Sequence, residues 1–115
     1  MEQVLTVEHI APDAAARLLA EGALLIDVRE PEEWQVGRAP QALHIPLGEL
    51  GGRLGELPSD RKLIMVCRSG GRSGQAAEAL VGRGLPAVNL AGGMQAWKSA
   101  SLPVVADGGV PGEVA

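Results

Sequence analysis

The sequence lacks the residues that build several common kinds of site. It has one cysteine, Cys67, in 115 residues, which excludes an internal disulfide, a C-x-x-C redox pair and a cysteine-rich zinc site. Its two histidines, His9 and His44, are far apart and have no partners at ligand spacing, so we expect neither a metal nor a cofactor. Phenylalanine and tyrosine are absent, which leaves Trp34 and Trp97 as the large aromatic side chains. Aliphatic side chains must therefore fill most of the core, with the two tryptophans as anchors.

The charge pattern and the hydrophobic pattern exclude two classes of partner. The net charge is −4 and the pI is about 5.1, which argues against a nucleic-acid-binding surface. No basic run is long enough for a membrane patch, and no apolar run approaches the length of a membrane span. Residues 1–4 show neither a basic n-region nor an apolar h-region. We therefore expect a cytoplasmic protein that binds neither nucleic acid nor membrane.

The length fits one domain that forms its core without metal or disulfide support. We assign residues 1–106 to this domain and expect the Gly/Pro-rich segment 107–115 to be a flexible tail. Strands are predicted at 4–7, 24–28, 43–46, 62–66 and 87–90. Helical segments are predicted at 12–20, from 31, irregularly over 47–57, from about 73 to 82, and at 94–100. This alternation predicts an α/β fold of three layers (α/β/α) around a mainly parallel sheet.

Ligands of such sheets bind beyond the carboxyl ends of the strands, and one predicted strand ends directly at Cys67. The loop that follows contains Gly70 and Gly71, which let the backbone turn its amides inward as an anion-binding nest. The helix N-terminus behind it, together with Arg68 and Arg72, favours a thiolate. The pattern predicts that Cys67 is a catalytic nucleophile; the alternative is an inert buried cysteine.

Loop length bears on which anion this loop holds. A cysteine phosphatase has an arginine six residues after its cysteine, whereas this sequence has Ser73 there and an arginine one place earlier, at Arg72. A loop shorter by one residue makes a smaller ring of amides, which suits one extra sulfur on the cysteine better than a phosphate. Val66 also stands where a phosphatase has histidine. A phosphatase or arsenate reductase is therefore the disfavoured enzyme alternative.

The sequence resembles single-domain rhodaneses, which are thiosulfate sulfurtransferases. The resemblance rests on LIDVREPEEW (25–34) with the following Gly37-Arg38 and HIP (44–46), on CRSGGRS (67–73), and on LAGGMQAW (90–97). Departures lie outside the loop, at Ala39 and Gln41, where the family often has Ile and Gly. The resemblance implies a five-stranded parallel sheet with helices on both sides.

The resemblance also implies a reaction. The Cys67 thiolate attacks the outer sulfur of thiosulfate, sulfite departs, and the persulfide passes its sulfur to cyanide, a thiol or a protein acceptor. A second hypothesis is a module that carries or binds a persulfide without turnover. The sequence leaves the oligomeric state open, and a monomer is compatible with it.

Each remaining site residue has two readings. Arg72 is predicted to bind the sulfonate of the donor, or else to be a solvated surface arginine. Arg68 binds the anion or attracts it at longer range. Ser69, Gly70 and Gly71 are expected to offer backbone amides.

Ser73 is predicted to cap the following helix, with a hydrogen bond to the sulfur as the second possibility. The resemblance implies that Asp27 and Arg29 support the loop; the alternative is an ordinary exposed ion pair.

Overall fold

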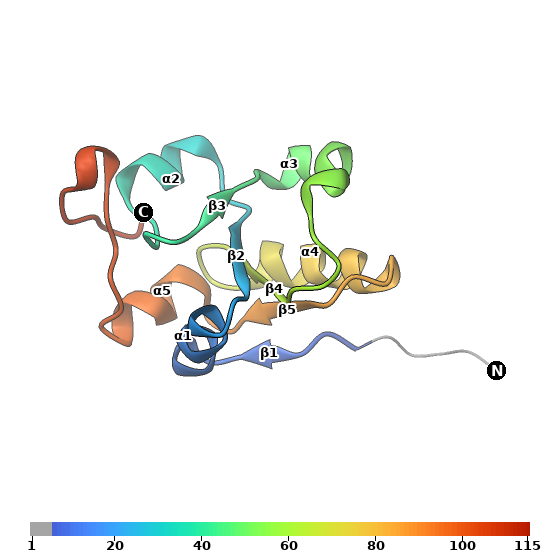
Figure 1. Cartoon of the computed structure of the whole chain (residues 1–115). Coiled ribbons are helices and arrows are strands. Elements are labelled where there is room, and N and C mark those ends of the chain that lie inside the picture. The colour runs from blue at the N-terminus through green and yellow to red at the C-terminus, as the bar shows by residue number, and fades with distance from the viewer. Residues whose placement is uncertain (1–5) are drawn as a thin grey trace.

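A computed structural model describes residues 6–115 and shows a five-stranded, all-parallel sheet in the order β1-β5-β4-β2-β3 (Figure 1). The strands are β1 (His9–Ile10), β2 (Leu24–Asp27), β3 (Leu43–His44), β4 (Leu63–Val66) and β5 (Ala87–Leu90). The predicted fold class is confirmed. The four predicted strands from residue 24 onward all form, some of them one or two residues shorter than expected.

Within residues 6–115, five α-helices connect and cover the strands: α1 (Pro12–Ala20), α2 (Pro31–Val36), α3 (Leu47–Leu50), α4 (Gly71–Gly82) and α5 (Gly93–Ser99). Two 3₁₀ turns, η1 (Gly51–Glu56) and η2 (Asp107–Gly109), complete the chain. Proline at the first position starts both α1 and α2, where its missing N–H costs nothing. None of these helices is long and apolar enough to cross a membrane.

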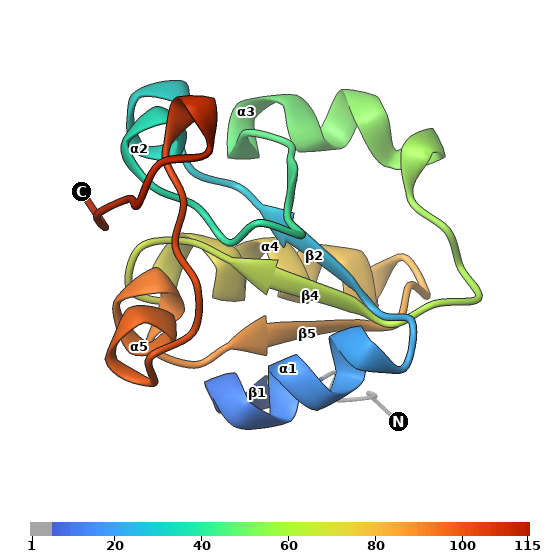
Figure 2. The same ribbon diagram turned by 60° about the vertical axis from the view of Figure 1, so that its left-hand side comes forward.

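The core has two parts, one on each face of the sheet, because neighbouring residues of a strand point to opposite faces. Leu63 and Met65 of β4 pack with side chains of α3 and α4, whereas Ile64 and Val66 pack with side chains of α1 and α5. In Figure 2, α1 lies in front of β1 and α4 lies behind β4, on opposite sides of the sheet. All four β4 side chains are buried, so β4 is fixed from both sides at the point where the loop of Cys67 begins.

The prediction of a first strand at 4–7 was wrong where the structure tests it. Val4 and Leu5 lie outside the described residues, Thr6 and Val7 are not in a strand, and the first strand forms at His9–Ile10. There, Asn89 N–H donates to the Glu8 carbonyl and the strand pairs with β5. Pairing with β5 therefore decides the position of the strand, and hydrophobicity alone does not.

The C-terminal segment lies beside α2 in both ribbon views (Figures 1 and 2). Arg38 and Val105 exchange two backbone hydrogen bonds, and Glu113 N–H donates to the Val36 carbonyl. Gly37 is required at this crossing, since a Cβ there would lie 2.0 Å from the Glu113 carbonyl oxygen. The flexibility of 107–115 stays a prediction; the structure shows where the segment packs.

Candidate active site

The loop that begins at Cys67 is fastened by the N-terminus of α5. Met94 N–H donates to the Cys67 carbonyl (2.8 Å), and Gln95 N–H donates to the Arg68 carbonyl (3.0 Å). This approach depends on Gly93, which has a φ of +60° and whose Cβ, if present, would lie 2.5 Å from the Cys67 carbonyl oxygen. The glycine turn of the LAGGMQAW motif (90–97) thus holds the CRSGGRS loop (67–73) in place.

The Cys67 side chain is nearly buried and is surrounded by hydrogen-bond donors. Gly70 N–H donates to the sulfur at 3.1 Å, and the Ser73 hydroxyl lies 3.2 Å from it. Burial raises the pKa of the Cys67 thiol, but the Ser73 hydroxyl and the amides of Ser73, Gly70 and Ser69 outweigh burial and lower the pKa overall. The loop therefore favours a thiolate, as expected, chiefly by hydrogen bonding.

Ser73 does not cap the helix, so the first reading of this residue was wrong. Gly70, with a φ of +107°, is the residue before α4, and no side chain caps it. The Ser73 hydroxyl instead lies between two partners, the sulfur of Cys67 and the side-chain oxygen of Asn89, 2.6 Å away. Because Ser73 lies within the first turn of α4, its fully buried side chain turns inward to the sulfur and not outward to the helix end.

Asn89 continues this network beneath the loop. Its side-chain nitrogen donates to the Gly70 carbonyl (3.1 Å) and lies 3.0 Å from Nδ1 of His9. Asn89 therefore ties together β5, the loop and the first turn of α4. We did not single it out from the sequence, although a lone asparagine in an apolar strand signals a buried polar group that needs partners.

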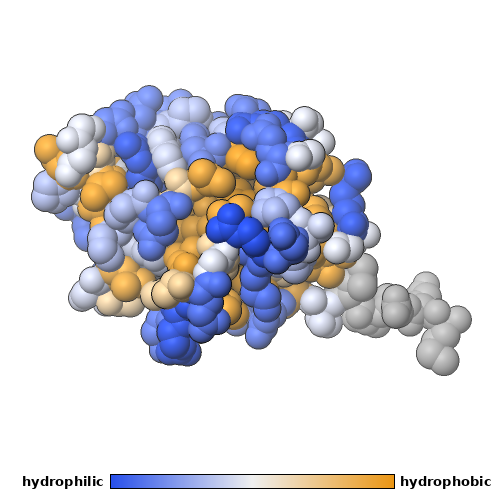
Figure 3. Space-filling view, viewed as in Figure 1, coloured by the Kyte–Doolittle hydropathy of each residue, from blue (hydrophilic) through white to orange (hydrophobic). Residues whose placement is uncertain are grey.

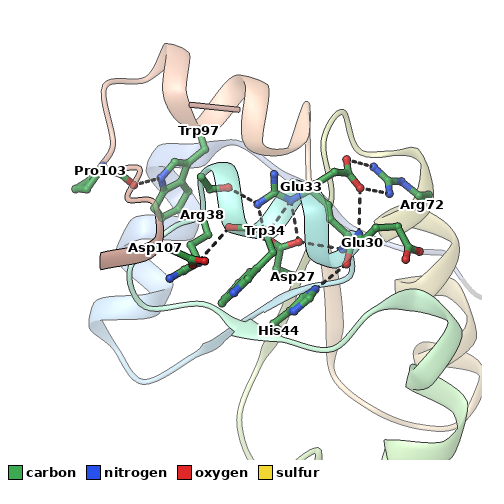
Figure 4. A network of polar contacts seen from close by, with 12 residues as sticks. Asp27, Glu30, Glu33, Trp34, Arg38, His44, Arg72, Trp97, Pro103 and Asp107 are labelled. Carbon is green, nitrogen blue, oxygen red and sulfur yellow. Dashed lines mark hydrogen bonds and ion pairs between the residues drawn. The ribbon is translucent and has the colours of Figure 1, made fainter. Parts of the chain in front are cut away.

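Arg72 faces a carboxylate across the site (Figure 4). Its two terminal nitrogens donate to the two oxygens of Glu33, at 2.8 and 2.9 Å. The bond from Arg72 lowers the pKa of Glu33 to about 2, and the carboxylate raises the pKa of Arg72 in return. Glu33 comes from α2 and was not among the predicted site residues. As the third residue of α2, three after Glu30, it fits a capping box, but nothing in that pattern indicates Arg72 as a partner.

Arg68 also has a partner, since its Nε donates to the carbonyl oxygen of Ala115 at 2.6 Å, on the surface. Both arginines of the loop thus contact other parts of the chain. Beside the loop, a hollow of about 460 Å³ is lined by Gly70, Gly71, His9 and Glu78 together with further residues of α4 and the segment before β1. A small molecule can approach the loop from this side.

Asp27 and Arg29 form a fully buried ion pair, so the reading of an exposed pair was wrong. Arg29 donates to both oxygens of Asp27 (2.8–3.1 Å) and to the Gly37 carbonyl (2.7 Å). Asp27 pairs in register with Val66, the residue before Cys67. The pair therefore fixes the strand next to the loop without bonding to the loop itself, and its role as loop support stays a prediction.

Trp34 lies at the edge of this cluster and is only half-buried, unlike Trp97, which is a core anchor as expected. The Trp34 ring stacks on the His44 ring, with centroids 4.5 Å apart, and the Arg38 guanidinium lies 4.7 Å from the Trp34 centroid. Nε2 of His44 is 2.7 Å from the Arg29 carbonyl oxygen. His44 thus joins the stack to the backbone of Arg29. Within residues 6–115, no three His, Cys, Asp or Glu side chains gather as metal ligands would.

We compared the chain with known protein families, proteins and solved structures. The family model described as "Rhodanese-like domain" matches residues 11–100. A protein of Allochromatium vinosum named "Sulfurtransferase" is 41% identical over 90% of this chain and 99% of its own length. "Thiosulfate sulfurtransferase GlpE" of Pseudomonas syringae is 32% identical over 80% of this chain and 88% of its own.

Among solved structures, a rhodanese-related protein of Thermoplasma volcanium superposes with a TM-score of 0.80. It is 33% identical, and the match covers 85% of this chain and 97% of that protein. The matches span one domain with its carboxyl-edge loop around Cys67, and the expected resemblance is confirmed. The chain belongs to the rhodanese family of sulfurtransferases.

Proposed function

We propose that this protein transfers a sulfane sulfur through a persulfide on Cys67. The observation that carries the proposal is the set of donors around the sulfur: the Gly70 amide at 3.1 Å and the Ser73 hydroxyl at 3.2 Å. The amides of the loop around Cys67 can in turn hold a persulfide anion, which places its charge one atom farther out than the thiolate. A preformed thiolate also needs no neighbouring base, and the described site has none bonded to the sulfur.

The donor we propose is thiosulfate or a similar donor of sulfane sulfur, and the acceptor is cyanide, a thiol or a protein. The Cys67 thiolate attacks the outer sulfur, the S–S bond of the donor breaks, and sulfite leaves with the electron pair. The persulfide then gives its outer sulfur to the acceptor. The name of the Pseudomonas syringae relative, a thiosulfate sulfurtransferase, supports this choice of donor.

A second candidate is a persulfide carrier without turnover, because Cys67 is the only thiol in the sequence and cannot be discharged internally. Intact mass spectrometry of the reduced protein, incubated with thiosulfate alone, separates the possibilities. We expect a gain of one sulfur atom that disappears on adding cyanide, and none in the isosteric Cys67→Ser variant. A gain that cyanide and thiols leave in place would support the carrier. No gain at all, with the thiol confirmed free, would reject the persulfide mechanism.

A further inference from the structure

The cation expected to receive the donor is already occupied. Both terminal nitrogens of Arg72 donate to Glu33, and two parallel bonds of this kind are the geometry in which an arginine binds the oxygens of a sulfonate. The Glu33 carboxylate therefore takes the place that a thiosulfate anion would take on Arg72. The pair is only partly buried, with 37% of the Arg72 side chain and 20% of the Glu33 side chain exposed, so a soluble anion can compete for it.

Glu33 is held in this position from its own helix. One of its oxygens accepts a hydrogen bond from Glu30 N–H (3.0 Å), which closes a capping box at the start of α2. Its pKa of about 2 keeps it charged at neutral pH, and the nearby Arg29 contributes to that low value. A donor sulfonate must therefore displace a fixed, fully ionised carboxylate to reach Arg72.

We propose that Glu33 determines the donor class of this sulfurtransferase. By occupying Arg72, it disfavours donors that carry a sulfonate, such as thiosulfate, and leaves the loop to donors that bring only sulfur to Cys67, namely hydropersulfides. This inference rests on the proposed function. It concerns which donor loads Cys67 fastest, and not whether a persulfide forms.

A hydropersulfide R–S–SH loads Cys67 without a co-reactant. The Cys67 thiolate attacks the terminal sulfur, a bond forms between the two sulfurs, and the S–S bond to R breaks. The electron pair departs with RS⁻, and the proton stays on the transferred sulfur, giving Cys67–S–SH. Formally, Cys67 loses two electrons and the donor gains the same two, so no other oxidant is needed. The amides of the loop receive the transferred sulfur, and no step requires the Arg72 guanidinium.

The experiment measures the rate of persulfide formation on the full chain with thiosulfate and with cysteine hydropersulfide as donors. We expect the hydropersulfide to load the wild type faster at equal concentration. In Glu33→Gln, an amide offers one acceptor atom instead of two and keeps the capping box. We expect it to lower the KM for thiosulfate about tenfold, the size of one charge-assisted hydrogen bond, with little change for the hydropersulfide. Glu32→Gln is the matched control, since Glu32 is an exposed neighbour on the same turn with no described bond to Arg72.

The variant Glu33→Gln combined with Arg72→Ala tests whether the gain passes through Arg72. It should lose the improved thiosulfate KM and keep hydropersulfide loading, which also shows that the site is folded. The inference is overturned if Glu33→Gln raises the thiosulfate KM, because Glu33 would then orient Arg72 toward the donor. An equal fall in Glu32→Gln also overturns it, by indicating a general charge effect. If neither donor loads the wild type, the proposed function itself fails, a distinct outcome.

Discussion

The hydroxyl oxygen of Ser73 lies 3.2 Å from the sulfur of Cys67, at the sequence position where a cysteine phosphatase carries its arginine. A neutral donor aimed at the sulfur thus stands where a phosphatase places a cation for phosphoryl oxygens. The loop is built to stabilise charge on sulfur itself. The shorter loop, with Ser73 in place of the phosphatase arginine, therefore fits the persulfide chemistry proposed for the protein.

Replacement of Ser73 by alanine should raise the pKa of Cys67, because the strongest of the interactions that lower it is lost while burial still raises it. Cys67 reacts as the thiolate, so its alkylation rate rises as the pH increases through the pKa. We expect the inflection of the rate–pH profile to move to higher pH in Ser73→Ala. An unmoved inflection would assign the low pKa to the backbone amides alone.

Replacement of Asn89 by alanine should have the opposite effect. The Asn89 nitrogen faces the Gly70 carbonyl, which can only accept, so its oxygen faces Ser73 and can accept the one hydroxyl proton that also reaches the sulfur. Asn89 therefore competes with the sulfur for that proton. In Asn89→Ala the hydroxyl is free to donate to Cys67, and the alkylation inflection should move to lower pH. A shift to higher pH would instead mean that Asn89 orients Ser73 toward the sulfur.

The fold was predictable because its signals are local and repeated. The buried runs at 24–28, 62–66 and 87–90, separated by helix formers, specify an α/β sheet, and the glycine loop after 66 specifies its functional edge. The first strand was misplaced because a two-residue edge strand is defined by its partner. Residues His9 and Ile10 are no more strand-like than 4–7, and only the pairing with β5 distinguishes them.

The site was predictable as far as Cys67 and its loop, and not beyond. Glu33 reaches Arg72 across 39 positions, and Asn89 reaches Ser73 across 16, so no spacing rule connects them. The sequence also does not show whether Asp27 and Arg29 are buried or exposed, because charged residues at this spacing occur in both kinds of ion pair. Their burial is a tertiary effect, because it depends on packing and on partners such as the Gly37 carbonyl that the chain brings to Arg29. Figure 3 shows hydrophobic and hydrophilic side chains intermixed on the surface of one face.

Replacement of Gly93 by alanine should destabilise the protein and displace the loop. The new Cβ would meet the Cys67 carbonyl oxygen at 2.5 Å, and the residue has a φ of +60°. We expect a loss of about 2–4 kcal/mol in the free energy of unfolding, measured by urea denaturation, together with slower alkylation of Cys67. Gly48→Ala is the control, because nothing lies within 4 Å of its Cβ position and it lies in α3, where alanine is favourable. Equal losses in the two variants would contradict the close approach.

Replacement of Asp27 by asparagine should cost more than any exposed ion pair. It leaves the guanidinium of Arg29 buried and uncompensated, with Nη1 already without a hydrogen-bond partner in residues 6–115. Loss of one member of a buried pair typically removes about 3–5 kcal/mol from the free energy of unfolding. Glu56→Gln, which breaks the exposed pair with Arg53, should leave stability unchanged. If Asp27→Asn also slows the loading of sulfur onto Cys67 under conditions in which the variant is fully folded, the expected support of the loop is confirmed.

The bond between Glu33 and Arg72 should make stability depend on pH in a defined window. The pKa of Glu33 is about 2 in the folded protein and 4.5 in the unfolded chain, so the folded state holds fewer protons between these values. The stabilisation is complete above about pH 4.5 and is lost as the pH falls toward 2. The difference in unfolding free energy between the wild type and Glu33→Gln should therefore be constant at higher pH and shrink across this window. In an Arg72→Ala background the main cause of the low pKa is removed. The pH dependence of the Glu33→Gln effect on the free energy of unfolding should therefore flatten. A difference that stays constant down to pH 2 would show that the pKa of Glu33 is the same in the folded and unfolded states. Arg72 would then not hold this carboxylate and would be open to the sulfonate of a donor.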